Sequence, residues 1–472
     1  MNDQAVIKKI AERLTKTGSS PMYLKLSDII VQLSESGDLK PNDRLPPIRK
    51  LASALLVNNS TVVNAYKHLE NRRVAYSIPG SGTYLSEIDL FTKDVVIPAD
   101  KMERGFELQD SINFAASHTS LSLFPVDEFK LLFTEVLERD RGNAFDYQSS
   151  QGYEPLRQAI CDYVEAEGIK TDIDKIQIIS GAQQGVDIVS KGVLSAGDCV
   201  FVENPTYYGA VAAFMSRGAE VVSIDMRDDG LDMEELVAKV RVYRPKLLYI
   251  MTYYQTPTCF SYSLEKKRRL LELSAQYGFH IIEEDNLSDF SFDSGSAPVV
   301  PLKALDYKNR VIYIKSFSKI LMPGLRLGFM IMPRSILERV KSAKYVTDIE
   351  TSGFVQRAFE LFLTRGGFDA HIRKMVSAYK KRYEAMKTAS RLYLGEKTFF
   401  NDPGGGLSFW YICPGGMDSD EFCEMLLQHG IVASPGSLFT VNSRKSDHFR
   451  LSFANLSEKD IKKGIKKIGS LL

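Results

Sequence analysis

The chain has 472 residues, of which 44% are hydrophobic and 25% are charged, and its formal net charge is +1. This length predicts more than one domain, and the composition is typical of a globular protein rather than a disordered or fibrous one. The net charge excludes a polycation, yet residues 1–85 hold 12 Lys and Arg against 7 Asp and Glu. A basic head on a mildly acidic body favours nucleic-acid contact by the head, although a solvated basic surface would show the same imbalance.

The five cysteines are scattered, and no two of them have the CxxC spacing of a zinc site. We therefore expect neither a disulfide framework nor a bound metal. The N-terminal segment MNDQAVIKKIAERL lacks the long apolar core of a signal peptide, and no apolar run approaches the length of a membrane span. The sequence thus predicts a cytoplasmic protein that does not contact a membrane.

Two helices are predicted in the first half of the head. Residues 20–35 place apolar side chains at helical spacing, namely Leu26, Ile29, Ile30 and Leu33. The stretch SGDLKPNDRLPP is rich in Gly, Pro, Asn and Asp, which predicts a loop. A second, short helix is marked by Ile48, Leu51, Leu55 and Leu56.

A third helix and a hairpin complete the head. Asn58, Asn59 or Ser60 can cap the helix. Its buried side would consist of Val62, Tyr66 and Leu69. The segment RVAYSIPGSGTYLS alternates apolar and polar residues around a Pro-Gly-Ser-Gly turn, which predicts a β-hairpin. Three helices and a hairpin within residues 20–86 predict a winged helix-turn-helix.

Such a domain inserts its last helix into the major groove, and neighbouring groups contact phosphates. The polar face of that helix would carry Asn59, Ser60, Thr61, Asn64 and Lys67. Arg44 and Arg49 lie where a guanidinium can reach a phosphate, and the wing around Gly82 can approach the minor groove. Each of these residues alone is explained equally well as part of a solvated helix face.

Residues 87–109 have mixed charge and weak periodicity, which indicates a linker. Beyond them, strand-like runs alternate with helical stretches: KIQIIS, CVFVE, EVVSID, KLLYIM, HIIEED and RVIYIKS. This alternation predicts an α/β domain with a mostly parallel sheet over residues 110–472. The runs GGLSFWYI, GIVASPG and FRLSFA predict a smaller α+β lobe near the C-terminus.

The segment SFSKILMPGLRLG, residues 316–328, gathers the groups that a pyridoxal phosphate site needs. Lys319 supplies an amine for a Schiff base with the cofactor aldehyde. Ser316, Ser318 and Arg326 supply hydroxyls and a guanidinium for the phosphate. The turn SGAQQG opens a predicted helix whose free N–H groups favour an anion. Each signal alone is weak, but the two together in this order predict a cofactor site.

The stretch from PMYLKLS to GSGTYL resembles the GntR-type winged helix over its full length. It keeps the core G-x-L-x-P-x-D-x-LP-x-x-R-x-LA, the helix STV-x-x-AY-x-x-L and the GSGT wing. The resemblance implies operator binding as a dimer, with Arg49 and the start of the third helix on double-stranded DNA. Asn59 stands where the family usually has Arg, which leaves the operator sequence open.

Residues 110–472 resemble fold type I aminotransferases, and the whole chain resembles MocR-type regulators of the GntR superfamily. The resemblance implies a homodimer with shared cofactor sites and assigns roles to residues in YQSSQGYEPLR, SGAQQGVD, ENPTYYG, YYQTPT and FRLSFA. The cofactor contacts it implies are Ala182, Gln183, Asn204, Tyr207 and Thr256, with Tyr147 reaching the partner's phosphate. It places Arg450 where the family holds an amino-acid carboxylate.

The departures from the family pattern lie around the cofactor ring. Glu284 aligns with the carboxylate that faces the pyridine nitrogen, but Asp285 would serve if the strand end shifted by one, because strand alternation lets only one point inward. The family's Tyr at the ring hydroxyl is missing, with Asn286 and Leu287 in its neighbourhood, and the family's loop Asn is Thr256. We therefore expect cofactor binding with slow or absent transamination.

These residues predict a transcription regulator that senses an amine, an amino acid or the cofactor itself at Lys319 and thereby changes the geometry of its heads. An active aminotransferase with a regulatory head is the alternative, and a DNA-binding protein with the large domain as a mere dimerisation scaffold is a third reading. The altered ring environment argues against the second. The intact set of Ser316, Ser318, Lys319 and Arg326 argues against the third.

Overall fold

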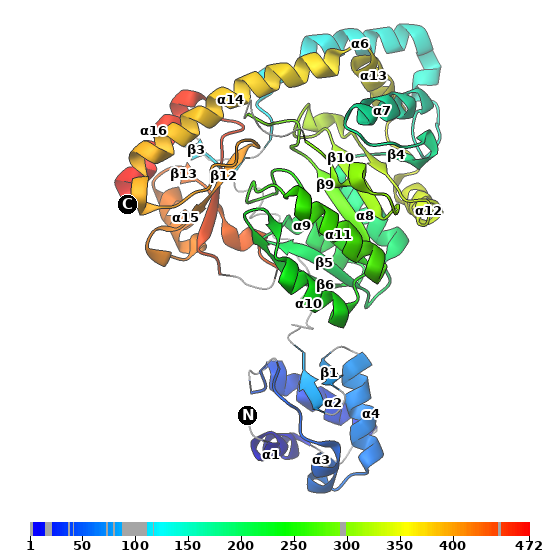
Figure 1. The fold of residues 1–472 in the computed structure, drawn as a ribbon, viewed down its shortest axis with the longest axis vertical. Coiled ribbons are helices and arrows are strands. Elements are labelled where there is room, and N and C mark those ends of the chain that lie inside the picture. The colour runs from blue at the N-terminus through cyan, green and yellow to red at the C-terminus, as the bar shows by residue number, and fades with distance from the viewer. Residues whose placement is uncertain are drawn as a thin grey trace. The chain divides into compact units, whose positions relative to one another are not determined.

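The computed structural model describes residues 3–14, 21–35, 38–40, 42–71, 74–78, 81–86, 111–116, 118–292, 299–441 and 445–472. The chain divides into two compact units, Met1–Val96 and Ile97–Leu472, here called the head and the body (Figure 1). The predicted linker 87–109 lies outside the described residues. Among the helices that are described, none is long and apolar enough to cross a bilayer.

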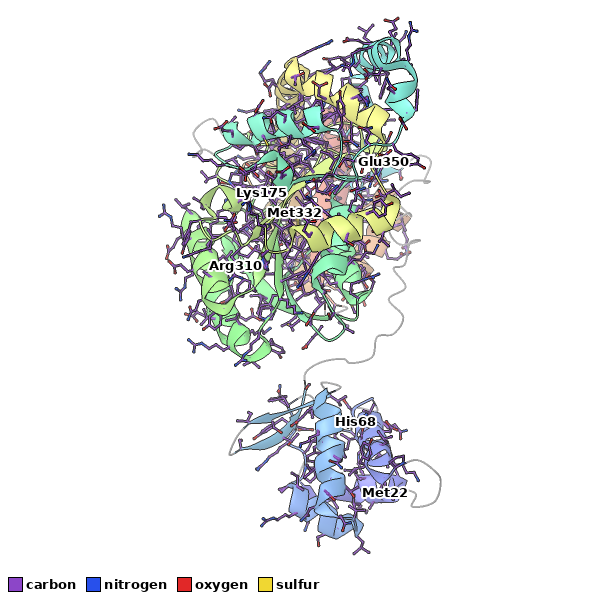
Figure 2. The ribbon with its side chains drawn as sticks, turned by 90° about the vertical axis from the view of Figure 1, so that its right-hand side faces the viewer. Met22, His68, Lys175, Arg310, Met332 and Glu350 are labelled. Atoms are coloured by element: carbon purple, nitrogen blue, oxygen red, sulfur yellow. The ribbon has the colours of Figure 1, made fainter. Side chains whose placement is uncertain are left out.

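The head is a winged helix-turn-helix, as predicted. Its elements are α1 Asp3–Arg13, α2 Met22–Glu35, α3 Ile48–Leu55, α4 Asn59–Asn71, β1 Ala75–Ile78 and β2 Gly82–Leu85. Strands β1 and β2 pair antiparallel. The apolar faces expected on α2 and α4 are buried. The two helices lie side by side, with Ser27 Oγ 2.9 Å from Nδ1 of His68 (Figure 2).

The sequence analysis missed helix α1. Val6 and Ile10 of α1 are fully buried in the same apolar core as α2 and α4. Lys9 and Arg13 on its polar side form ion pairs with Asp38. The helical spacing of Val6 and Ile10 was the available signal. Leu56, expected to mark the second helix, is instead its 82% exposed C-cap residue with a φ of 54°.

The body is built on an eight-stranded sheet in the order β4-β11-β10-β9-β8-β5-β6-β7. The strands are β4 Ile176–Ile179, β5 Cys199–Asn204, β6 Glu220–Arg227, β7 Gly230–Leu231, β8 Leu247–Ile250, β9 His280–Asp285, β10 Val311–Ser316 and β11 Gly328–Ile331. The six predicted strand runs are all strands. Neighbours from β10 to β6 pair parallel, whereas β11 pairs antiparallel with both β10 and β4. Beyond β11, Met332 N–H donates to the Lys175 carbonyl over 3.0 Å (Figure 2).

Helices cover both faces of this sheet, so its strands are apolar on both sides. The described helices of the body, of which α14 to α16 belong to the small lobe, are α6 Val126–Asp140, α7 Glu154–Ala166, α8 Ala182–Val193, α9 Tyr208–Met215, α10 Met233–Tyr243, α11 Leu264–Tyr277, α12 Leu337–Asp348, α13 Gly353–Thr364, α14 Gly367–Tyr393, α15 Ser419–Gln428 and α16 Glu458–Leu471. On β5, Val200 and Val202 pack with α8 and α9, while Phe201 packs on the opposite side with α10 and α11.

The predicted small α+β lobe forms around α14, α15 and α16 (Figure 1). Its strands are β3 Ile112–Asn113, β12 Ser408–Ile412, β13 Ile431–Val432, β14 Ser434–Pro435 and β15 His448–Ser452. Strands β12, β15 and β14 form an antiparallel sheet, and β13 pairs parallel with β3. The start of the body is thereby fixed to its C-terminal lobe.

We predict that α1 stabilises the head. Ile10→Ala removes fully buried atoms and should destabilise the head by about 2–5 kcal/mol. Hydrogen exchange of the full-length protein, followed by mass spectrometry, should show lost protection in α2. Lys8→Ala, at an exposed position on the same helix, is the control. Unchanged protection of α2 in the Ile10 variant would contradict the prediction.

Candidate functional site

A cavity of about 1280 Å³ lies where the parallel strands end. Residues at or just beyond the carboxyl ends of β4, β5, β8, β9 and β10 form one wall, which is where open α/β sheets bind ligands. The small lobe supplies the opposite wall through α15, the segment 432–439 and β15. The cavity therefore lies between the two lobes of the body.

Ten of the residues predicted for the cofactor and effector site line this cavity. They are Ala182, Gln183, Tyr207, Thr256, Glu284, Ser316, Ser318, Lys319, Arg326 and Arg450. Tyr147, Asn204 and Asp285 are not among its lining residues. The structure thus brings together segments that are far apart in the sequence.

Lys319 lies in the turn that follows β10. Its carbonyl accepts a hydrogen bond of 2.7 Å from the Thr119 hydroxyl, and the next carbonyl, of Ile320, lies 2.9 Å from Nε2 of His371. Burial lowers the pKa of the Lys319 ammonium; Glu284 opposes this shift and the Arg450 guanidinium adds to it. A lowered pKa favours the neutral amine, which is the nucleophilic form.

The N-terminus of α8 and Arg326 form an anion cradle. Ala182 and Gln183 in the first turn line the cavity, and no side chain caps the helix. Arg326 donates to the Ser180 carbonyl over 2.6 Å, and Ser316 Oγ donates to Ser318 Oγ over 3.2 Å. Gly181 has a φ of 101°, and a Cβ there would lie 2.9 Å from Nη2 of Arg326. Uncapped N–H groups, two hydroxyls and a guanidinium fit a phosphate dianion.

Glu284, and not Asp285, faces the cavity. The Tyr249 hydroxyl donates to its Oε2 over 2.5 Å, and the Asn286 amide donates to its Oε1. Asp285 lies within a buried cluster on the other side of the strand, where its Oδ2 accepts from Tyr313 over 2.6 Å and from Lys315 over 3.1 Å. Burial would raise the pKa of Asp285, but Lys315 holds it below its usual value. Strand alternation separates the two neighbours.

Asn204 does not lie where the resemblance implied. Its side-chain amide donates to Asp225 over 2.9 Å, because the two residues are opposite each other in the β5–β6 register. Tyr207, three residues further on, does line the cavity, and burial raises the pKa of its hydroxyl to about 12. Tyr207 therefore stays a hydrogen-bond donor at neutral pH.

The departures from the family pattern are visible around Glu284. Leu287 is buried and is not part of the cavity wall, whereas Asn286 and Thr256 are. Cys259 has a φ of 57°, the conformation for which glycine is suited. Its thiol lies 3.3 Å from the Ser408 hydroxyl, and burial raises its pKa. Both observations favour a packing role for Cys259.

The guanidinium of Arg450, on β15, has only some of its hydrogen bonds satisfied by the protein. Its Nη2 donates to the Ala115 carbonyl and to the Ser434 hydroxyl, each over 3.1 Å. Its Nε is buried and has no hydrogen-bond partner among the described residues. Burial lowers the pKa of the guanidinium to about 10. A ligand carboxylate in the cavity would supply the missing acceptors.

The sequence analysis missed two buried polar residues beside the site. Tyr249 was interpreted as part of an apolar strand, yet its hydroxyl donates a hydrogen bond to Glu284. Glu203 is fully buried, and its Oε1 accepts from the Tyr262 hydroxyl over 2.7 Å and from Met251 N–H over 3.1 Å. Its Oε2 accepts from Gln255 over 3.1 Å. A carboxylate inside an apolar strand was the available signal, because buried charges need partners.

In the head, the residues predicted to contact DNA lie on the surface of α3, α4 and the wing. Most are exposed, namely Arg44, Arg49, Asn59, Ser60, Asn64 and Lys67, and Thr61 is half-buried. The wing lies against Arg44, since a Cβ at Gly82 would meet its Nε at 2.8 Å. The burial of Val62, Tyr66 and Leu69 leaves the polar face of α4 outward.

Residues 110–468 match the family model described as aminotransferase class I and II, which covers more than half of the chain. The chain belongs to this family. Its head, residues 22–85, matches the model described as bacterial regulatory proteins, gntR family. A gntR-family head joined to a class I and II aminotransferase domain is the organisation of MocR-type regulators, so the predicted membership is confirmed. The expected cofactor, pyridoxal 5'-phosphate, is that of the aminotransferase family.

The proteins to which this chain is similar include both transcription regulators and aminotransferases. It is 24% identical to the probable rhizopine catabolism regulatory protein MocR of Rhizobium meliloti, over 97% of this chain and 95% of the relative. It is 31% identical to aromatic-amino-acid aminotransferase 1 of Thermococcus litoralis, over 78% of this chain and 89% of the relative. The structure of a multiple substrate aminotransferase from Thermococcus profundus has a TM-score of 0.75 at 30% identity, covering 79% of this chain and 94% of that one.

We predict that Gly181 is required for the anion cradle. Gly181→Ala should displace the Arg326 guanidinium and raise the dissociation constant of pyridoxal phosphate by about 10- to 100-fold, the worth of a hydrogen bond to a charged group. Absorbance titration of the apoprotein measures this. Gly278→Ala is a matched control, because its φ is also positive, at 83°, and a Cβ there meets nothing within 4 Å. Equal affinities in the two variants would contradict the prediction.

Glu203 should make the stability of the body depend on pH. Burial raises its pKa from 4.5 to about 8, so the folded state holds this proton more tightly than the unfolded state. The resulting stabilisation is complete below the unfolded pKa of 4.5 and is lost as the pH rises through about 8.

The fluorescence of Trp410, the single tryptophan, can follow urea unfolding at several pH values across this range. Glu203→Gln should flatten the decline in the free energy of unfolding, while Glu265→Gln, at an exposed position, should leave it unchanged. If the free energy of unfolding of Glu203→Gln fell with pH as steeply as that of the wild type, the Glu203 carboxyl would be ionised in the wild-type body and the prediction would be wrong.

Proposed function

We propose that this chain is a DNA-binding transcription regulator whose body binds pyridoxal phosphate at Lys319 and senses a small amine or amino acid. The observation that carries the proposal is one cavity that unites Lys319, an anion cradle and a partly satisfied Arg450 in a chain with a gntR-family head. A ligand that binds two arrangements of the heads with different affinity would shift their populations.

Each part of the cofactor has a counterpart in the cavity wall. Ser316, Ser318, Arg326 and the start of α8 would hold the phosphate, and Glu284 would face the ring nitrogen. The bound cofactor supplies an aldehyde that reacts reversibly with primary amines. Lys319, with its lowered pKa, presents the amine, and Arg450 would hold the carboxylate of an amino-acid ligand.

The ring environment favours sensing over turnover. Tyr207 can donate a hydrogen bond near the ring. The family's tyrosine at the ring hydroxyl is missing, however, and the apolar Leu287 aligns with it, while Thr256 replaces the family's loop asparagine. Fewer groups remain to direct protons and charge during transamination, whereas the groups for binding are intact. Catalysis should therefore suffer more than ligand binding.

The similarity to aminotransferases supports a second candidate function, namely amino-group transfer. The two functions are separated by incubating the holoprotein with amino acids and a 2-oxo acid. The regulator predicts a reversible change in cofactor absorbance without steady release of new 2-oxo acid, and Lys319→Ala should lack the absorbance that the lysine–cofactor bond gives before any ligand is added. Sustained turnover would overturn it in favour of the enzyme.

DNA binding is tested on duplexes selected by the wild-type holoprotein from a random library. Arg49→Ala should weaken binding to all duplexes and reduce its salt dependence, whereas Asn64→Ala should relax base selection. Lys380→Ala, at an exposed position in the body, is the control. An effector amino acid should change the affinity of the wild-type protein for the selected duplex. If neither head variant alters binding, the assigned DNA surface is wrong.

We infer that the body forms a homodimer through an apolar face, in line with the prediction for Tyr147. The exposed side chains of this face are Leu131 and Leu137 on α6, Phe145 and Tyr147 after it, and Tyr345 and Val346 on α12. The segment after α6 lies beside the residues that follow α12, because Gln148 N–H donates to Glu350 over 2.6 Å, and α6 packs against the next helix, α13 (Figure 2). Contiguous exposed apolar surface commonly marks a protein interface.

The double variant Leu131→Glu/Val346→Glu places charges on this face. It should convert the dimer to a monomer, so that the molar mass in solution falls to that of one chain. The two positions are 70% and 81% exposed, so the fold of a single chain should tolerate both changes. Light scattering after size exclusion measures the mass. Leu392→Glu, at a 69% exposed position on α14, controls for added surface charge. A double variant that remains dimeric would place the interface elsewhere.

A further inference from the structure

Helix α15 walls the cavity on the side away from the sheet. Five of its residues line the cavity: Asp420, Glu421, Cys423, Glu424 and Leu427. They follow the three- and four-residue spacing that places side chains on one helical face. Three of the five are carboxylates, so this face presents negative charge to whatever enters the cavity.

The stability of α15 accounts for only part of this charge. Asp420 and Glu421 lie in the first turn, where negative charge is favourable. Glu424 lies beyond that turn, three and four residues from two like charges, which is unfavourable in a helix. None of the three carboxylates forms an ion pair with a Lys, Arg or His of the described residues.

Glu421 and Glu424 are exposed and Asp420 is half-buried, so water solvates their charge in the open cavity, and the rest of the wall offers few cations to pair with it. The basic residues of the described lining, apart from His118, are Lys319, Arg326 and Arg450. The cofactor would engage Lys319 through its aldehyde and Arg326 through its phosphate, so Arg450 alone would face the ligand. A ligand carboxylate on Arg450 would leave the three carboxylates of α15 without a cationic partner among the described lining residues.

Arg450 and α15 lie on either side of the segment that ends in Phe439. Arg450 donates to Ser434 on β14, and α15 packs against β14 and the following turn Gly436–Phe439. Apolar side chains of this region also line the cavity, namely Leu427, Val432, Pro435, Leu438 and Phe439. The wall therefore combines a carboxylate-binding group, apolar surface for methylenes and a carboxylate cluster.

We propose that the effector is an α-amino acid with a cationic side chain. Arg450 binds the carboxylate of the effector, and the α-amine of the effector lies beside Lys319, where the cofactor aldehyde would be. The terminal ammonium or guanidinium of the effector lies among Asp420, Glu421 and Glu424. The proposal rests on the proposed function and adds the chemical class of the ligand. It also assigns the α15 carboxylates as the residues that determine specificity.

The test uses the full-length holoprotein and follows cofactor absorbance during titration. The probes are L-lysine, L-ornithine and L-arginine, with L-norleucine as an uncharged analogue of lysine and L-glutamate as an acidic one. The best cationic probe should bind at least about tenfold more tightly than norleucine, which corresponds to about 1.4 kcal/mol. Glutamate should bind most weakly.

The triple variant Asp420→Asn/Glu421→Gln/Glu424→Gln should lose this preference while keeping its affinity for norleucine. Its matched control, Glu234→Gln/Glu265→Gln/Glu384→Gln, removes the same charge at exposed positions outside the cavity and should keep the preference. Operator binding should respond to the same amino acid in the wild-type protein and lose that selectivity in the triple variant.

The outcomes separate this inference from the proposed function. If norleucine or glutamate binds as tightly as every cationic probe, or if the triple variant keeps the preference, the specificity is wrong while amino-acid sensing stands. If none of the amino acids changes either the absorbance or operator binding, amino-acid sensing itself fails, and the effector class fails with it.

Discussion

The parallel pairing of β5, β8, β9 and β10 determines where the chemistry of the body can occur. Because these strands run in one direction, the segments that follow them meet at a single edge of the sheet. Residues from Tyr207 to Lys319 reach one cavity for this reason. Helices on both faces exclude water from the strands. Arg326 lies beside the start of α8 because the first residue of β11, Gly328, pairs with Ile179 at the end of β4.

Burial at this edge changes the chemistry of ordinary side chains. Lys319 has a lowered pKa because its charged form is poorly solvated, and Arg450 carries a charge that the described protein groups only partly satisfy. Both effects make the cavity receptive to a ligand that brings a carbonyl, a carboxylate or both. Glu284 stays aimed into the cavity because Tyr249 and Asn286 hold its two oxygens.

In the proposed regulator, the second wall of the cavity is what would make the site respond to a ligand. The small lobe contributes Arg450 and the α15 carboxylates, whereas the sheet contributes the predicted phosphate cradle. A ligand that contacts both walls would stabilise one arrangement of the lobes over others, which is the differential binding that a regulator needs. An enzyme with the same cradle would additionally need groups that direct protons at the ring, and at Thr256 and Leu287 this sequence departs from the pattern that the aminotransferase resemblance implies.

The sequence by itself determined the fold of both units and named most of the predicted cofactor-site residues that line one cavity. Strand runs and helix periodicity are local patterns, and Ser316, Ser318, Lys319 and Arg326 lie within one short segment. The choice between Glu284 and Asp285 needed the tertiary structure, because a shift of one residue reverses which side chain points inward. The same holds for Asn204, which the β5–β6 register pairs with Asp225.

The sequence held only weak local signals for helix α1 and Glu203, and packing decided their roles together with those of Tyr249 and the α15 carboxylates. Their roles come from residues distant in the chain: Leu26 and Leu69 beside α1, Glu284 beside Tyr249, and Tyr262 beside Glu203. No local pattern distinguishes a carboxylate that lines a cavity from one on a solvated helix face. That distinction arises when the small lobe packs against the sheet and encloses the space between them.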